Sequence, residues 1–256
     1  MNLATVQFAS AALQRPATYI ALLPDAGVVG PGPYPVLVQL HGYYDDYRSW
    51  LTKSNLLQHA KTYPIMIILP DTANGWWANL GAPNQFEDLI VNDLKAHVHS
   101  TFQVRPGRWA IGGLSMGGFG ALRLGLKHAD MFCSIYAHSS AIPKPGLARG
   151  FPFVWDDPDR SAAQRRRLRQ DLSCYHWADQ VDSTLMPRLS FDCGTEDVLL
   201  DENRRFHEYL DKIGLPHSYA EYPGGHHWEY WDTHVRQALA QHAEVFGVRQ
   251  AQDLIG

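Results

Sequence analysis

The chain has 256 residues, of which 45% are hydrophobic and 19% are charged. This composition is typical of a globular protein with one sizeable core, and it excludes a disordered or fibrous chain. The formal net charge of -4 provides no broad basic field, so we expect no nucleic acid partner.

The first residues and the cysteines bear on where the chain works. Residues 1–15 lack a basic start followed by an apolar core, and no run of about 18 apolar residues occurs. Cys133, Cys174 and Cys193 are odd in number and form no CxxC pair, so neither a disulfide framework nor a zinc knuckle is indicated. We therefore expect a cytoplasmic protein with free thiols, no export signal and no membrane span.

Strand-like and helix-like segments alternate along the chain. Residues 5–10 and 18–23 predict a hairpin that enters a larger sheet. Short apolar runs then predict buried parallel strands that end at Leu40, Leu69, Leu114, Cys193 and Tyr222, with one more that begins at Phe132. Helical spacing covers residues 51–61, 86–102, 116–127, 202–213 and 230–246. This alternation predicts a single α/β domain over residues 1–256, a mostly parallel sheet with helices on both faces.

One stretch departs from the alternation. Residues 142–186 begin with a loop rich in proline, glycine and aromatic residues, and a basic helix follows the loop. We predict an excursion that covers the sheet and the site at its edge, because the stretch holds no strand and too little apolar surface for a core of its own.

A serine with five neighbouring glycines follows the strand that ends at Leu114. The segment Gly113-Leu114-Ser115-Met116-Gly117 fits the nucleophile elbow G-x-S-x-G, a strained strand-to-helix turn that exposes the serine hydroxyl. Glycines remove collisions with the incoming strand. A phosphate-binding turn and a purely structural turn are the alternatives, but the segment contains neither G-x-G-x-x-G nor G-K-[ST].

A nucleophilic serine needs a base and a group that orients the base. The chain order known for this elbow is serine, then an acid, then histidine. Asp197 follows the penultimate strand and is the predicted acid; Glu196 is its adjacent alternative, whereas Asp192 lies inside the strand. His226 follows two glycines after the last strand and is the predicted base, with His227 expected to point away.

Two backbone N–H groups are needed to stabilise the negative oxygen of an acyl-transfer intermediate. Met116, directly after the serine, is one predicted donor. The turn after the first parallel strand supplies the other, from Tyr43 or Gly42, and a buried hydrogen bond of His41 is expected to hold this turn. Tyr43 and Tyr44 either line the acyl pocket or cover the edge of the sheet.

Together, the motifs LHGYYDD, LPDTANGWW, IGGLSMGGFGAL, DCGTED and GGHHWEYW resemble those of the esterase D group of α/β-hydrolases. The resemblance spans residues 8–245. The group includes tributyrin and other short-chain carboxylesterases, feruloyl esterases, S-formylglutathione hydrolases and mycolyltransferases. Matching its motifs implies Ser115, Asp197 and His226 as the catalytic triad, and Tyr43 and Met116 as the oxyanion donors.

Within this group, S-formylglutathione hydrolases resemble one another in having a histidine before the elbow serine and a cysteine shortly after the HG pair. This chain has Leu114 and the pair Tyr43-Tyr44 at those places. The elbow and the ANGWW segment are most similar to the cytoplasmic short-chain esterases.

The positions of several aromatic and basic residues in the sequence also predict their roles. Tyr44, Trp77 and Trp228 lie on loops at the carboxyl edge of the sheet and are the predicted substrate contacts. His97 and His99 face different sides of a helix, so they predict no metal site. No other cofactor is expected either. The basic run 165–169 predicts a solvated helix face, and His138, just past a strand, is interpreted as a structural histidine.

We therefore predict a serine carboxylesterase that cleaves small-molecule esters of short acyl chains through an acyl-serine intermediate. Aromatic loops and the cover over residues 143–155 predict a preference for about two to four acyl carbons. The alternatives on the same triad are an acyltransferase, a feruloyl or acetyl esterase, and a thioesterase similar to S-formylglutathione hydrolase. The alternative from another functional class is a catalytically inactive binding module. The sequence leaves open whether the protein forms a homo-oligomer.

Overall fold

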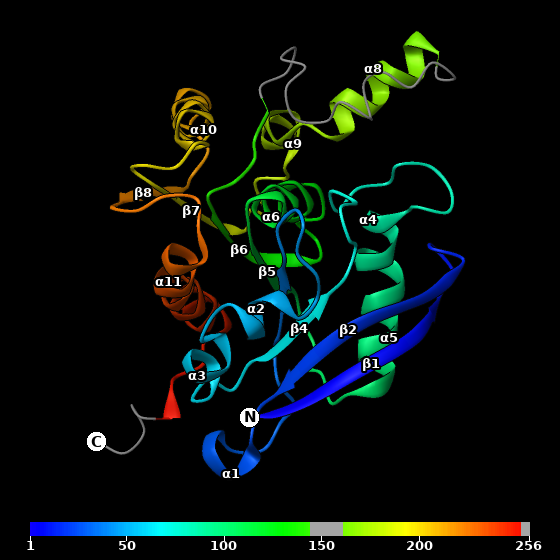
Figure 1. Ribbon diagram of the computed structural model, residues 1–256, viewed down its shortest axis with the longest axis vertical. Helices are drawn as coiled ribbons and strands as arrows, with labels where there is room; N and C mark the ends of the chain where they lie inside the picture. The colour runs from blue at the N-terminus through cyan, green and yellow to red at the C-terminus, as the bar shows by residue number, and fades with distance from the viewer. Residues whose placement is uncertain (144–160, 252–256) are drawn as a thin grey trace.

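The computed structural model describes residues 1–143 and 161–251. A sheet of eight strands forms its centre, in the order β1-β2-β4-β3-β5-β6-β7-β8. The strands are β1 (Asn2–Ser10), β2 (Arg15–Leu23), β3 (Val36–Leu40), β4 (Met66–Pro70), β5 (Trp109–Leu114), β6 (Phe132–His138), β7 (Arg188–Gly194) and β8 (Ser218–Tyr222). The hairpin of β1 and β2 is antiparallel and joins β4, whereas β3 to β8 run parallel. The predicted mostly parallel sheet is confirmed (Figure 1).

The parallel strands are buried because helices cover both faces of the sheet. The described helical segments are α1 (Ala26–Val29), α2 (Ser49–Thr52), α3 (Leu56–Ala60), α4 (Phe86–Asp88), the π-helical η1 (Leu89–Leu94), α5 (Lys95–Thr101), α6 (Met116–Lys127), α8 (Ala162–Asp171), α9 (Cys174–Gln180), α10 (Leu200–Ile213) and α11 (Trp228–Phe246). One apolar layer is made with α5, α6, α9 and α10, and the other with α2, α3 and α11. The strand ends are thereby held at one protected edge of the sheet.

Two predicted helices differ in detail from the structure. The predicted helix 51–61 is divided into α2 and α3, because the carboxylate of Asp232 on α11 accepts the backbone N–H of Asn55 at 2.6 Å. That bond takes a donor which a continuous helix would use for itself. The predicted helix 86–102 contains the π-helical turn η1, and its apolar stripe is buried as expected.

The excursion holds a helix that the sequence did not predict. Besides α8, which is the expected basic helix, α9 follows Ser173, whose hydroxyl accepts the N–H of His176 at 3.1 Å. Cys174, Tyr175 and Ala178 on α9 are buried. Part of the excursion therefore contributes to the core through a helix too short for periodicity to identify. The loop expected to cover the site lies mainly in residues 144–160, outside the described residues.

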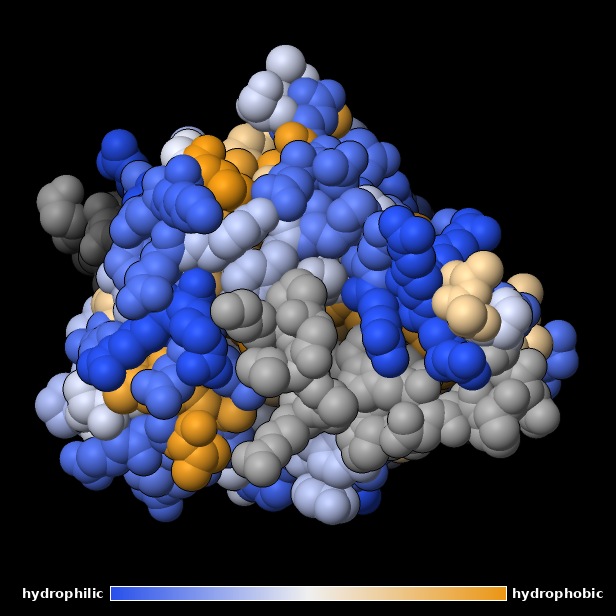
Figure 2. Space-filling model, turned by 90° about the horizontal axis from the view of Figure 1, so that it is seen from above, coloured by the Kyte–Doolittle hydropathy of each residue, from blue (hydrophilic) through white to orange (hydrophobic). Residues whose placement is uncertain are grey.

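The face seen from above in Figure 2 is mostly polar in its described part. Figure 2 shows hydrophilic side chains over most of the described part of one face, with smaller hydrophobic groups between them. Within residues 1–143 and 161–251, no helix has the length and apolar character to cross a membrane.

Candidate active site

Ser115 occupies a strained turn between β5 and α6. Its φ of 53° lies in the left-handed region that residues with a side chain rarely adopt. A Cβ on Gly117 would lie 2.6 Å from the carbonyl oxygens of Leu40 and His41, and a Cβ on Gly113 would lie 2.4 Å from the Gly117 oxygen. Only glycine permits this close approach of the turn to β3. The sequence therefore builds a sharp strand-to-helix turn with the serine at its tip.

The three residues predicted for the triad meet at this tip. His226 Nε2 lies 3.0 Å from Ser115 Oγ, and His226 Nδ1 lies 3.0 Å from each carboxylate oxygen of Asp197. Asp197 and His226 stand on the loops after β7 and β8, the neighbouring strands of the sheet. Residues separated by 111 positions are thus within hydrogen-bond distance.

The charge state of Asp197 sets the proton on the imidazole. Burial by itself raises the pKa of the Asp197 carboxyl, but hydrogen bonds from His226 and from the Leu199 N–H outweigh burial and hold that pKa below its ordinary value. An ionised carboxylate only accepts, so Nδ1 of His226 carries the hydrogen. Nε2 is then the acceptor that faces the Ser115 hydroxyl, which is the arrangement that activates a serine nucleophile.

The neighbouring candidates lie elsewhere. His227 borders the cleft, but its ring is 52% exposed and its Nδ1 lies 3.1 Å from a carboxylate oxygen of Glu229, so its imidazole faces Glu229 and not the serine. Glu196 is exposed to solvent. Asp192 is fully buried in β7, where it accepts from Tyr230 Oη and faces His138 Nδ1, both at 2.8 Å. His138 is therefore structural, as interpreted from the sequence.

The loop after β3 packs directly against the elbow. A Cβ on Gly42 would lie 3.6 Å from Ser115 Cβ, so the loop backbone borders the serine. Nδ1 of buried His41 donates to the Gly42 carbonyl at 2.8 Å, which is the expected bond that holds this turn. Within the described chain, the backbone N–H groups of Tyr43 and Met116 have no acceptor. Both are near the serine and free to bind an anion.

A cleft of about 440 Å³ opens at the serine. Its walls include Tyr43, Tyr44, Trp228 and Trp231, together with Ser115 and His226. Tyr44 is 86% exposed at the surface, whereas Tyr43 is half-buried. Two of the predicted substrate contacts, Tyr44 and Trp228, thus line the cleft.

Trp77, the third predicted substrate contact, is in a different place. Its side chain is fully buried, and its indole Nε1 donates to the His41 carbonyl at 3.3 Å. The indole packs directly against Gly120 of α6, because a Cβ at that position would lie only 2.7 Å from the ring. The prediction of a substrate contact was wrong, because the indole supports the loop after β3 from below and does not reach the cleft.

Residues that the sequence did not single out surround the triad. The Trp231 ring lies with its centre 4.9 Å from that of His226, nearly perpendicular to it, and Trp231 Nε1 donates to Ser139 Oγ at 3.0 Å. Ser139 is also among the groups that lower the pKa of the Asp197 carboxyl. The sequence feature that could have identified Ser139 is its place directly after β6, the strand next to β5, which ends at the elbow.

Comparison with known proteins agrees with this geometry. The Esterase family model matches residues 10–242. The chain belongs to the Esterase family. This esterase is 29% identical to an acetyl esterase of Caldicellulosiruptor saccharolyticus, over 96% of this chain and 99% of the relative. It is 28% identical to an esterase of Mycobacterium tuberculosis over 80% of this chain, a match that spans 51% of that longer protein.

Solved structures share the fold. A ferulic acid esterase matches with a TM-score of 0.81 and 26% identity, over 96% of this chain and 98% of that one. An S-formylglutathione hydrolase from Agrobacterium tumefaciens matches with a TM-score of 0.81 and 19% identity, over 94% of each chain, which shows the fold alone. The protein is an α/β-hydrolase, and it is a carboxylic ester hydrolase.

Proposed function

We propose that this esterase hydrolyses esters of short acyl chains through a covalent acyl-serine intermediate, with Ser115 as nucleophile. The observation that carries the proposal is the chain of 3.0 Å contacts from Ser115 Oγ through the His226 imidazole to the Asp197 carboxylate. Ionised Asp197 holds the imidazole in the one tautomer that can accept the serine proton.

The reaction follows from these positions. His226 Nε2 takes the proton of Ser115 as Oγ attacks the ester carbonyl, and the carbonyl oxygen becomes negative. The N–H groups of Tyr43 and Met116 stabilise that oxygen as the oxyanion hole. His226 then gives its proton to the departing alcohol, which leaves the acyl group on Ser115. Water, activated by the same imidazole, releases the acid and restores the enzyme.

The cleft supports a preference for small acyl groups. Tyr43, Tyr44, Trp228 and Trp231 form aromatic walls of the cleft that contains the serine. A methylene that fits against them contributes about 0.8 kcal/mol of burial, whereas one that does not fit loses this and adds a clash. The similarity to an acetyl esterase agrees with a short acyl group.

The substrate proposal is tested with p-nitrophenyl esters of two to twelve acyl carbons and with a feruloyl ester. We expect kcat/KM to be greatest at about two to four carbons and to fall sharply beyond them. A twelve-carbon ester cleaved as efficiently as a four-carbon ester would contradict the short pocket. Adding an acceptor alcohol and analysing the products separates hydrolysis from acyl transfer.

The nucleophile is tested by Ser115→Ala and by a fluorophosphonate probe. We expect kcat to fall by a factor of about 10⁴, because the covalent route is lost. The probe should label Ser115 in the natural protein. Ser100→Ala, which changes an exposed serine of α5, is the matched control and should keep full activity. A folded Ser115→Ala protein with a tenth of the activity would refute the assignment.

We also propose that the enzyme works in the cytoplasm. Cys133, Cys174 and Cys193 are all free thiols, as expected in a reducing compartment. Burial raises the pKa of the Cys174 thiol to about 12, so this side chain is an inert part of the core. Recovery of the protein outside the cytoplasmic fraction of its source cells would contradict this location.

A further inference from the structure

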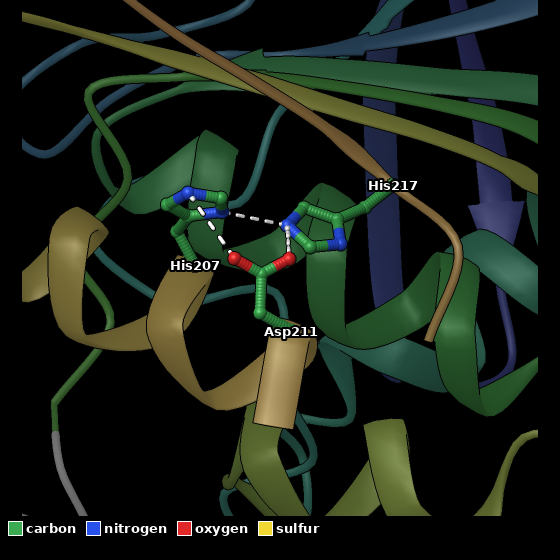
Figure 3. A group of neighbouring side chains, drawn as sticks. All are labelled: His207, Asp211 and His217. Atoms are coloured by element: carbon green, nitrogen blue, oxygen red, sulfur yellow. Dashed lines mark hydrogen bonds and ion pairs between the residues drawn. The ribbon is translucent and has the colours of Figure 1, made fainter. Parts of the chain in front are cut away.

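Two imidazoles and a carboxylate converge where α10 meets β8. His207 and Asp211 lie one turn apart on the same face of α10, and His217 directly precedes β8 (Figure 3). Gly214, with a φ of 69°, ends the helix in a left-handed turn and reverses the chain. The Leu215 N–H donates to the Leu210 carbonyl at 3.0 Å, so this turn holds His217 against the last turns of α10.

The spacing of the three side chains suits a bound metal ion. His207 Nδ1 lies 2.8 Å from His217 Nε2, and one potential ligand atom from each residue lies within 4.8 Å of the others. The Asp211 oxygens lie 3.5 Å from His207 Nε2 and 3.8 Å from His217 Nε2, which is too long for good hydrogen bonds. A tetrahedral zinc ion with ligands at about 2.0–2.2 Å separates neighbouring ligand atoms by roughly 3.3–3.5 Å. The 2.8 Å hydrogen bond between the two imidazoles therefore has to open by roughly 0.5 Å when the ion binds.

His217 is already oriented as a ligand. Its Nδ1 lies 2.8 Å from the Leu215 carbonyl, to which it donates, so the lone pair of Nε2 faces the cluster. A backbone carbonyl that binds the other ring nitrogen is the usual support of a metal-binding histidine. The His217 side chain is 4% exposed, and its ring stacks on that of Phe191 with an interplanar angle of 20°. Packing therefore restricts the ring before any ion arrives.

Metal binding requires the hydrogen of the His207 ring to move from one ring nitrogen to the other. Because His217 Nε2 is an acceptor, His207 Nδ1 donates its hydrogen to it in the metal-free protein. Ligation through Nδ1 requires the other tautomer, with the hydrogen on Nε2. The His207 side chain is 35% exposed, so solvent can accept the hydrogen on that atom. The neutral imidazole is kept, and the Asp211 carboxylate stays available as a ligand.

The charge and donor types point to zinc. Among the described residues, Asp211 pairs with no lysine or arginine, so its charge is available to a cation. Two imidazole nitrogens and one carboxylate oxygen are ligands of zinc, whereas calcium and magnesium prefer oxygen alone. We propose that His207, Asp211 and His217 bind one Zn²⁺ ion, with water from solvent as the fourth ligand. The Asp211 side chain is 64% exposed, which leaves that position open.

The role of this site is structural. Asp197 lies just before α10, and His226 lies just after β8, so an ion at the far end of both elements would join the two segments that carry these residues. The ion would stabilise the folded state, and it would take no part in the ester reaction. This inference does not depend on the proposed nucleophile or acyl preference.

The test is a competition titration of the purified protein against a chromophoric zinc chelator, with the melting temperature measured in parallel. We expect one Zn²⁺ per chain, and a rise in Tm of about 5 °C or more at a hundredfold excess over Kd. Cobalt(II) added to the apoprotein should give the visible absorption of a four-coordinate site. His226→Ala and His227→Ala should bind zinc unchanged, which excludes binding by the histidines of the cleft.

The decisive variant is Asp211→Ala, because an exposed helical position tolerates alanine. It should weaken zinc binding by more than about a hundredfold. Loss of a residue that only orients a metal ligand usually costs less than this. His207→Ala should do the same. The matched control changes His97 and His99 to glutamine, which removes two histidines elsewhere and should leave binding unchanged. Absence of one-to-one binding, or equal affinity in Asp211→Ala, would overturn the site.

Discussion

Replacing the adjacent histidines one at a time separates the base from its neighbour. His226→Ala removes the acceptor that lies 3.0 Å from Ser115 Oγ. Members of a triad act as a unit, so we expect kcat to fall by about 10⁴, which corresponds to about 5.5 kcal/mol of transition-state stabilisation. The variant leaves the buried Asp197 carboxylate without its imidazole but with the Leu199 N–H at 2.8 Å, so we expect a lower free energy of unfolding and a retained fold.

His227→Ala should have a much smaller effect. His227 Nε2 accepts the Gly225 N–H at 3.1 Å, and Nδ1 faces both Glu229 at 3.1 Å and the Tyr230 N–H at 3.4 Å. A neutral imidazole cannot accept at both nitrogens, so we assign the hydrogen to Nδ1, which donates to Glu229. The main loss is then the loop hydrogen bond from the Gly225 N–H, about 1 kcal/mol, because the exposed hydrogen bond to Glu229 adds little.

The assay is kcat on a short-chain p-nitrophenyl ester, with urea unfolding of both variants as the control for folding. We expect His227→Ala to lose less than tenfold in kcat. The reverse ranking of the two variants would move the base by one residue and refute the geometry of this loop.

Three further changes probe the supporting structure. Arg123→Met should lower the free energy of unfolding by about 3 kcal/mol in urea titrations, because it removes a cation that pairs with buried Glu87; an unchanged midpoint would contradict this. Burial lowers the pKa of His242 to about 3. Below about pH 6.5 this histidine therefore binds a proton in the unfolded chain but not in the folded protein. Stability should therefore fall by about 2 kcal/mol from pH 6.5 to pH 5, and His242→Gln should lack this part of the loss. Gly117→Ala should lower kcat more than tenfold, since its Cβ would lie 2.6 Å from two backbone oxygens, whereas Gly27→Ala in α1 should not.

The sequence by itself determined the features that depend on local pattern. Apolar runs of strand length and helical spacing placed every strand of the sheet and the helix after the elbow. The glycines beside Ser115 indicated the strained turn, because only a residue without Cβ allows so close an approach. Chain order then nominated Asp197 and His226, whose types and loops suit their roles.

Only the tertiary structure decided which side chains meet. Trp77 and Trp228 were both predicted as substrate contacts on loops, yet Trp77 packs against Gly120, whereas Trp228 begins α11 and lines the cleft. His207 and His217 carry no recognisable metal spacing, and they meet because the turn after α10 reverses the chain. Periodicity reports which face of an element is apolar, whereas burial and contact depend on segments that are distant in the sequence and are brought together only by packing.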